Sequence, residues 1–253
     1  MKPVLYDGTF EGLLTTVFEV YEFKIAALQI KRGDNSNGSL FGDVHVVQTN
    51  EEKAKRVLIK LEEKISRSAM NQFYKSFLSE LPGFDNVLLR YARYVIDGKH
   101  GVENDYGHPD VLAVQQTSKK VHREKHRMEA FVRFQLTKDG LYYAIIQPDY
   151  NVLPLIATHF KERYTDQQWL IYDSRRKYGL HYDLLEVTEV TIDFNERGNE
   201  EKVYDDNENL YQELWKHYFD SVNIKARRNM KLHIQHVPKR YWRHLIEKQK
   251  GMN

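Results

Sequence analysis

The chain has 253 residues, of which 41% are hydrophobic and 13% aromatic, and this composition excludes wholesale disorder. Its 38 Lys and Arg residues nearly balance 36 Asp and Glu residues, so the formal net charge of +2 excludes a generally polycationic protein. Cysteine is absent, which excludes disulfides, thiolate catalysis, iron–sulfur ligation and every zinc site built with cysteine.

The predicted elements of the first half alternate between short apolar runs and amphipathic helices. A strand at 4–6 and a turn at 7–9 precede a helix from 10 to about 28, because apolar residues recur there at helical spacing. A polar loop at 31–39 and a strand at 43–48 follow, and then a helix that Thr49 or Asn50 caps and whose buried stripe covers 54–65. Two further helices share residues 69–97, broken near 81–83 by Leu-Pro-Gly.

The second half begins with a long predicted helix from Pro109 to about Ala130. Thr-Lys-Asp-Gly at 137–140, between apolar runs at 131–136 and 141–147, is typical of a β-hairpin. We then expect a helix at 152–164, strands at 168–173 and 180–193, an acidic loop, a helix at 208–222, and a basic tail broken by Pro238.

This order favours an α+β fold: an antiparallel sheet partly covered by helices, with a helical N-terminal half and a basic C-terminal arm. We expect a core domain at 1–203, onto which a C-terminal helix and arm at 204–253 pack. Regular β–α–β alternation and Gly-rich phosphate loops are missing from the pattern. No run approaches the roughly 18 apolar residues of a membrane helix, and no signal peptide is visible. We therefore expect a soluble cytoplasmic protein without a membrane partner.

Charge is distributed unevenly along the chain. Residues 196–213 carry seven acidic residues against two basic ones, and residues 224–250 carry nine basic residues against one acidic. A second basic block covers 119–133. A charge run is most often a solvated helix face, but aromatic residues interleave the C-terminal block, and arginines beside planar side chains suit single-stranded or distorted nucleic acid.

The first group of residues that could carry chemistry lies on the long predicted helix. His122 and His126 are four residues apart and could chelate a metal with His159 as a third ligand, although histidines at this spacing are common on solvated helices. Glu124 is misplaced for the metalloprotease motifs. Because Glu124 and His126 are two apart, a helix points them in different directions. We expect no bound metal or other cofactor.

Two further groups follow. Asp173 ends a predicted strand and precedes Arg175 and Arg176, which suits phosphate handling or general-base chemistry, or else a structural salt bridge that caps a turn. In the tail, apolar residues would anchor the arm, and the arginines would face outward to phosphates. The candidate nucleic-acid contacts of the tail are Arg227, Arg228, Asn229, Arg240, Tyr241 and Trp242.

The same segments resemble a bacterial family of uncharacterised proteins linked to DNA metabolism or DNA repair. The resemblance rests on YDGTFEGLLTTVFEVYE at 6–22, EKHRMEAFVRF at 124–134, QPDYNVLPLIATHFKERY at 147–164, QQWLIYDSRRKYGLHYD at 167–183 and RRNMKLHIQHVPKRYW at 227–242. Carried over position by position, the family pattern falls on Tyr6, Asp7, Gly8, Phe10, Glu124, His126, Arg127, residues 131–134, Asp149, His159, Phe160, Arg163, Trp169, Asp173, Arg176, Arg227, Asn229, Pro238, Tyr241 and Trp242. His122 is outside it. The resemblance implies fusions to uracil-DNA-glycosylase-like domains in other members and a radical-SAM repair protein as a neighbour.

The leading hypothesis is a DNA-binding repair or DNA-metabolism protein, an accessory to a radical-SAM or glycosylase partner, that contacts single-stranded or damaged DNA. The expected nucleic-acid contacts are Arg127, Arg163, Arg175, Arg176, Arg227, Arg228, Asn229, Arg240, Tyr241, Trp242 and Trp169. The alternative is a nucleic-acid- or nucleotide-processing enzyme with Glu124, His126, His159 and Asp173 as catalytic residues. A third interpretation is a protein-interaction module whose basic arm docks on an acidic partner.

Overall fold

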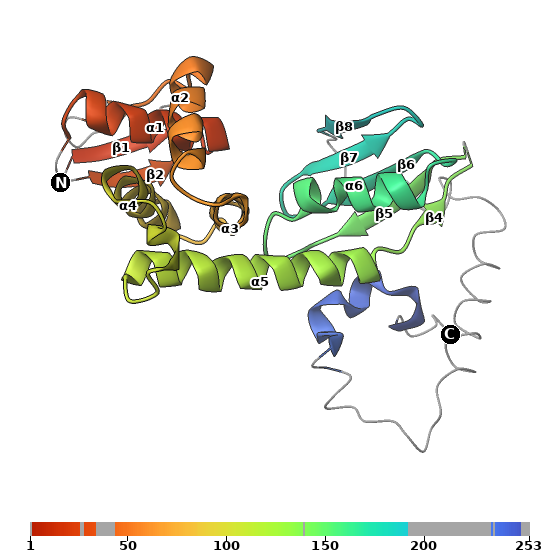
Figure 1. The fold of residues 1–253 in the computed structure, drawn as a ribbon. Coiled ribbons are helices and arrows are strands. Elements are labelled where there is room, and N and C mark those ends of the chain that lie inside the picture. Colours follow the sequence, from red (N-terminus) through yellow and green to blue (C-terminus); the bar gives the residue numbers. More distant parts are fainter. Residues whose placement is uncertain are drawn as a thin grey trace. The chain divides into compact units, whose positions relative to one another are not determined.

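The computed structural model describes residues 2–25, 28–33, 44–138, 140–191, 234 and 236–248. The chain divides into two compact units, residues 1–122 and 123–253 (Figure 1). Helix α5 (Pro109–Phe131) begins in the first unit and ends in the second, as the sequence predicted to within one residue. The domain boundary expected after residue 203 and the helix expected at 208–222 lie outside the described residues.

The first unit contains a parallel three-stranded sheet. Strands β1 (Lys2–Tyr6), β2 (Leu28–Arg32) and β3 (His45–Val46) lie in the order β2-β1-β3, and β1 pairs in parallel with both neighbours. Helix α1 (Phe10–Glu22) connects β1 to β2, which makes a β–α–β unit that the sequence analysis did not predict. The hydroxyl of Thr9 caps α1 by accepting the Gly12 N–H at 2.9 Å.

The predicted helix from 10 to about 28 is too long by six residues. Helix α1 ends at Glu22, and Lys24 has a φ of 49°, a left-handed conformation that stops a helix. Strand β2 then occupies residues that were assigned to the end of this helix and to the following loop. Ile30 is buried in the core while Gln29 is exposed, so the alternation of a strand is present but short.

The remaining helices of the first unit match the predicted pattern. They are α2 (Glu51–Glu62), α3 (Arg67–Phe77), α4 (Phe84–Asp97) and the short 3-10 helix η1 (Val102–Asn104). Asn50, rather than Thr49, caps α2, because the Thr49 hydroxyl donates instead to the Asp7 carboxylate at 2.7 Å. Gly83, with a φ of 74°, separates α3 from α4 at the expected break. Helix α1 packs on α2 and α4, and Leu13, Leu61 and Leu88 are fully buried.

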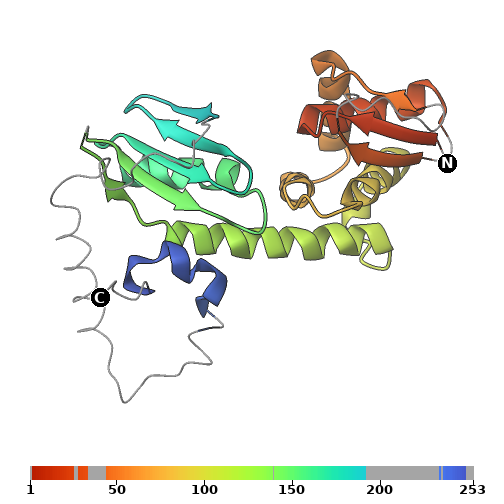
Figure 2. The same cartoon turned by 180° about the vertical axis from the view of Figure 1, so that it is seen from behind.

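The second unit is built on a five-stranded mixed sheet. Its strands are β4 (Gln135–Leu136), β5 (Tyr142–Ile146), β6 (Trp169–Asp173), β7 (Tyr178–Tyr182) and β8 (Val187–Val190), in that order across the sheet. All neighbours are antiparallel except β5 and β6, which are parallel and joined by helix α6 (Leu153–Arg163). Helix α6 lies over one face of this sheet, in front of it in Figure 1 and behind it in Figure 2.

The predicted hairpin around 137–140 is confirmed as the antiparallel pair β4–β5, although β4 has only two residues. The β structure predicted at 180–193 is confirmed and consists of the two strands β7 and β8. Two 3-10 helices, η4 (Lys239–His244) and η5 (Ile246–Lys248), come from the C-terminal segment and belong to the same unit.

The α+β class is confirmed, and the larger sheet is mostly antiparallel, as expected. Two β–α–β connections, β1–α1–β2 and β5–α6–β6, are present in addition to what the sequence predicted, one in each unit. Parallel pairing joins segments distant in the chain, so short apolar runs do not reveal which of them will be neighbours.

Candidate functional site

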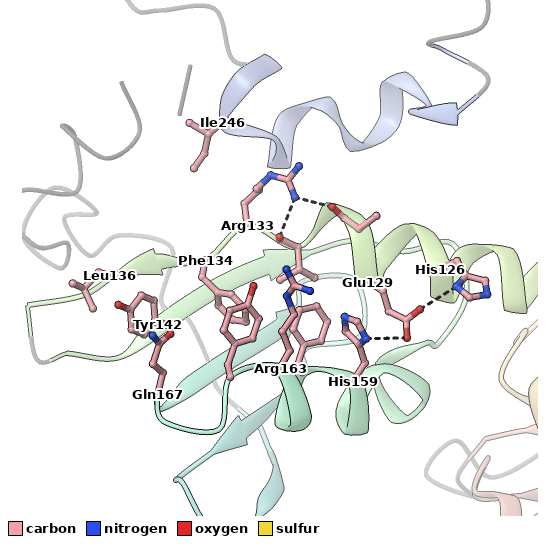
Figure 3. A pocket seen from close by; sticks show the side chains of 14 residues that line it. His126, Glu129, Arg133, Phe134, Leu136, Tyr142, His159, Arg163, Gln167 and Ile246 are labelled. Carbon is pink, nitrogen blue, oxygen red and sulfur yellow. Dashed lines mark hydrogen bonds and ion pairs between the residues drawn. The ribbon is translucent and has the colours of Figure 1, made fainter. Parts of the chain in front are cut away.

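A pocket of about 1040 Å³ lies in the second unit between the end of α5, the end of α6 and the start of β5 (Figure 3). This volume is at the upper end of the roughly 300–1,000 Å³ typical of small-molecule sites. The residues that line the pocket are His126, Glu129, Ala130, Val132, Arg133, Phe134, Leu136, Tyr142, His159, Phe160, Arg163, Tyr164, Gln167 and Ile246. Two of them, His126 and His159, are predicted catalytic residues, and Arg163 is a predicted nucleic-acid contact.

Helical spacing explains why these side chains share one pocket. On α5, His126 and Glu129 are three residues apart and therefore lie on one face of the helix, and Arg133 follows two residues after the helix ends. On α6, His159 and Arg163 are four residues apart and also share a face. The pocket thus has a wall from each helix, and the aromatic residues between the helices form its apolar surface.

Glu129 lies between the two histidines. Its Oε2 is 3.1 Å from His126 Nδ1, and its Oε1 is 3.9 Å from His159 Nδ1. Lys125 Nζ also pairs with Oε1, at 2.6 Å. The carboxylate is mostly buried, with 12% of its side chain exposed, against 61% for His126 and 37% for His159. A mostly buried carboxylate that faces the Nδ1 atoms of two imidazoles orients both rings toward the pocket.

Glu129 was not among the predicted site residues. Its spacing in the sequence could have indicated this role, because a residue three positions after His126 lies beside it on a helix. Glu124 was predicted instead because the family pattern includes Glu124 and omits Glu129.

The apolar surface of the pocket is aromatic. The rings of Phe134 and Tyr164 meet edge to face with their centroids 5.3 Å apart, and Phe160 stacks below Tyr164 at 6.1 Å. The Arg163 guanidinium lies 5.8 Å from the centre of the Tyr164 ring. Phe160 is buried, while Phe134 and Tyr164 are partly exposed. The pocket therefore combines ring faces with a cation, as sites for nucleobases and phosphates do.

Glu124 lies elsewhere and is the centre of a buried hydrogen-bond network. Its side chain is 1% exposed, as expected for a residue pointing away from His126. Its Oε1 accepts the Asp149 N–H at 2.9 Å, and its Oε2 accepts the Tyr241 hydroxyl at 2.5 Å and Arg240 Nη2 at 3.2 Å. Arg127 Nη1 adds an ion pair at 3.6 Å. With its oxygens occupied by protein donors, Glu124 fixes the C-terminal segment to α5.

Arg240 and Tyr241 complete this network. Arg240 Nη2 pairs with the Asp149 carboxylate at 2.8 Å, and its guanidinium lies 4.6 Å above the Tyr241 ring. Burial, followed by the hydrogen bond to Glu124, raises the pKa of the Tyr241 hydroxyl above its ordinary value. Burial alone would lower the pKa of Arg240, but its hydrogen bond to Tyr241 and the nearby carboxylates raise it. The tyrosine therefore stays a donor and the arginine stays charged.

Asp173 is a structural residue in this geometry. It is fully buried, its Oδ1 accepts the backbone N–H groups of Arg175 and Arg176 at 2.9 and 3.2 Å, and its Oδ2 pairs with Arg176 Nη1 at 2.8 Å. The structural alternative, a salt bridge that caps the turn after a strand, describes this arrangement, and no part of the carboxylate is open to a substrate. Both guanidinium groups turn back to the Asp149 carbonyl, at 3.0 Å for Arg175 and 3.3 Å for Arg176.

The predicted stacking residues are placed in different ways. Trp169 and Tyr241 are 0% and 2% exposed, so neither ring offers a face to a base, and their placement gives that role no support. Trp242 is half-buried and donates its Nε1–H to the Val237 carbonyl at 3.0 Å. Arg227, Arg228 and Asn229 lie outside the described residues.

Metal binding gains no support from the described part of the chain, where no three His, Asp or Glu side chains are arranged to hold an ion. His122 was considered as a metal ligand together with His126, and its Nδ1 lies 3.5 Å from Lys75 Nζ. Across the same residues, none of the helices combines the length and the apolar character needed to cross a bilayer.

Comparison with known families gives one assignment. A family model described as a domain of unknown function, DUF4130, matches residues 82–247, which is more than half of the chain and includes every residue that lines the pocket. A search of curated proteins gives no match.

Proposed function

The chain belongs to the DUF4130 family, whose description names no activity, and we propose that it is a DNA-binding repair or DNA-metabolism protein that receives an unpaired nucleotide in the pocket of its second unit. One observation carries the proposal. Of the predicted nucleic-acid-binding arginines within the described residues, Arg163 is the one whose guanidinium forms no hydrogen bond or ion pair with another described residue.

The other predicted nucleic-acid-binding arginines among the described residues are occupied by protein acceptors. Arg127 and Arg240 pair with Glu124, Arg176 pairs with Asp173, and Arg175 donates to the Asp149 carbonyl. Arg163 is exposed, lines the pocket and lies beside the partly exposed rings of Tyr164 and Phe134. A cation next to ring faces binds single-stranded nucleic acid through phosphate contact and base stacking, without requiring a particular sequence.

Replacement of Arg163 by glutamine is expected to weaken single-stranded DNA binding, because the charge that would contact a phosphate is lost. We expect roughly a tenfold loss of affinity. The slope of the logarithm of the binding constant against the logarithm of salt concentration should fall by about one, which corresponds to one lost phosphate contact. Fluorescence anisotropy with a labelled single-stranded or mismatched oligonucleotide, titrated at several salt concentrations from about 50 mM upward, measures both quantities.

The matched control is Lys55→Gln, which removes one exposed positive charge from α2 in the first unit. If Lys55→Gln weakens binding as much as Arg163→Gln, the effect is one of net charge and the pocket is not the site. Absence of binding by the unaltered protein at about 50 mM salt, where phosphate contacts are strongest, would contradict the proposal itself.

The partners are part of the same proposal. The resemblance to a repair-linked family supports a radical-SAM repair protein or a uracil-DNA-glycosylase-like protein as the enzyme that this chain assists. A protein-interaction module remains the alternative. Co-purification of such a partner that survives high salt and nuclease treatment would favour direct protein contact over bridging by DNA.

A second candidate function, nucleotide processing by the pocket itself, is favoured by the position of Glu129 between His126 and His159. In such a reaction one imidazole takes a proton from an attacking water and the other gives one to the leaving oxygen, and the carboxylate between the two rings orients them. Asp173 and Glu124 have no part in this candidate, because their carboxylates are buried and bonded to protein donors.

This candidate predicts that His159→Ala and His126→Ala each lower phosphodiesterase turnover by roughly 10²–10⁴-fold, the usual contribution of general acid–base catalysis. Hydrolysis of bis(p-nitrophenyl) phosphate and of short oligonucleotides, with and without EDTA, measures the effect. The melting temperature should change little, since both rings are substantially exposed. His181→Ala, on β7 and outside the pocket, is the control. Equal losses in all three variants, or no turnover by the unaltered protein, would eliminate the enzyme candidate.

A further inference from the structure

We infer that the pocket binds a single nucleotide in one direction, with the phosphate at the His159–Arg163 end and the base at the Tyr142–Gln167 end, where Gln167 selects the base. The inference rests on the proposed function and adds to it an orientation and a specificity residue. In Figure 3, Tyr142 and Gln167 lie at one end of the pocket and His126 at the other, with Arg163 and His159 between them.

The phosphate end is defined by side-chain charge. His159 and Arg163 are one turn apart on α6 and both line the pocket, so a phosphate placed between them meets a guanidinium and an imidazole. This is the carboxyl end of α6, where the helix dipole does not attract anions, so side chains must supply the positive charge. The guanidinium fork forms paired hydrogen bonds with phosphate oxygens.

The charges around Glu129 decide whether an anion is tolerated there. Its carboxylate faces the ammonium of Lys125 at 2.6 Å and the imidazoles of His126 and His159 at 3.1 and 3.9 Å. Arg133, also in the pocket wall, pairs with Glu247 at 3.0 Å. The negative charge of Glu129 is thus neutralised locally by Lys125, and the guanidinium of Arg163 adds a positive charge at this end of the pocket.

The base end has polar side chains whose hydrogen-bonding groups are not bonded to other described residues. The side chains of Tyr142 and Gln167 line the pocket, are partly exposed, and form no hydrogen bond with other described residues. Tyr142 begins β5, Gln167 lies two residues before the parallel strand β6, and the Tyr142 N–H donates to the Gln168 carbonyl at 3.0 Å. A glutamine amide offers both a donor and an acceptor, which is what the edge of a nucleobase requires for selective pairing.

Between the two ends lie the rings of Phe134 and Tyr164, whose edge-to-face contact leaves both partly exposed. Ring faces stack with any base and therefore add affinity without selecting one. Gln167 and Tyr142 then select the base, while Arg163 and His159 bind the phosphate. These two contributions are separable by experiment because they come from different elements of the unit.

The test compares the four deoxynucleosides with their 5′- and 3′-monophosphates by calorimetric titration into the full chain. For the unaltered protein we expect either the 5′-monophosphates or the 3′-monophosphates to bind roughly tenfold or more tightly than the corresponding nucleosides. This gain is the effect of a charge-assisted hydrogen bond to the phosphate. Arg163→Gln should remove most of this ratio and leave nucleoside affinity within about twofold. Gln167→Ala should preserve the ratio but reduce the spread of affinities among the four bases.

Each other outcome overturns the inference. An Arg163→Gln variant that weakens nucleosides and nucleotides equally would show that the phosphate is not bound there. An unchanged base preference in Gln167→Ala would remove the specificity role. If oligonucleotides bind but mononucleotides neither bind nor compete, the orientation is wrong while the proposed function stands; if neither binds, the proposed function fails as well. Tryptophan fluorescence of each variant, matched to the unaltered protein, verifies that the second unit is folded.

Discussion

Replacing Glu124 by alanine is expected to cost the second unit roughly 2–4 kcal/mol of unfolding free energy, since several donors lose their acceptor at once. The Tyr241 hydroxyl and the Asp149 N–H both bond to this carboxylate, and Arg240 and Arg127 pair with it. The arginines are 43% and 30% exposed, so water can partly replace their lost partner. The buried tyrosine hydroxyl cannot be rehydrated as easily and accounts for much of the cost.

Tryptophan fluorescence during urea unfolding measures this change selectively. All three tryptophans of the chain, Trp169, Trp215 and Trp242, fall within residues 123–253, so the signal reports on the second unit. Circular dichroism at 222 nm follows both units. We expect the fluorescence midpoint of Glu124→Ala to fall, while the part of the dichroism transition that belongs to the first unit stays in place.

Two variants separate the contributions. Glu124→Gln keeps an acceptor oxygen for the Asp149 N–H or the Tyr241 hydroxyl and should lose less stability than the alanine variant. Tyr241→Phe removes only the hydroxyl and should cost about 1 kcal/mol. If Glu124→Ala unfolds at the same urea concentration as the unaltered chain but loses DNA binding, Glu124 is a functional residue rather than the attachment point of the C-terminal segment.

Local rules predicted most of the helices. Side-chain caps at Thr9 and Asn50, the break at Gly83 and the Pro109 start each act within one turn of chain, and such signals are present in a short stretch of sequence. Parallel pairing is different. A helix separates β1 from β2, and another separates β5 from β6, along the chain, so each pair forms only when that helix folds back against the rest of its unit. That pairing depends on tertiary packing, which a single sequence does not display.

The candidate site was predicted only in part, because the burial of each side chain also depends on tertiary packing. His126 and His159 were expected to act together, and the structure places both beside Glu129 in one pocket. Residue type alone could not distinguish Arg163, which faces the pocket, from Arg176, whose side chain is 9% exposed against Asp173. The aromatic residues raised the same difficulty, because Trp169 fills the core and Tyr164 borders the pocket. Burial, which decides between a structural and a functional role, emerges only from the folded chain.

Replacement of Asp173 by alanine is expected to destabilise the second unit by roughly 3–5 kcal/mol, the cost of breaking a buried ion pair on one side. Arg176 would stay buried without its charged partner, while the Pro148 and Asp149 carbonyls still accept from its guanidinium at 3.2 and 3.3 Å. The turn after β6 would also lose the acceptor for two backbone N–H groups. Lys177 in this turn has a φ of 62°, so the turn already holds a strained residue that depends on its neighbours.

Asp173→Asn distinguishes the charge from the turn. The amide oxygen can still accept from the two backbone N–H groups, so this variant should lose the ion pair but keep the cap, and its stability should lie between those of the alanine variant and the unaltered chain. Urea unfolding followed by tryptophan fluorescence measures all three, and Trp169 at the start of the same strand is a direct reporter. Should Asp173→Asn match the unaltered chain in stability yet abolish a nucleotide-processing activity, Asp173 would act in catalysis after all.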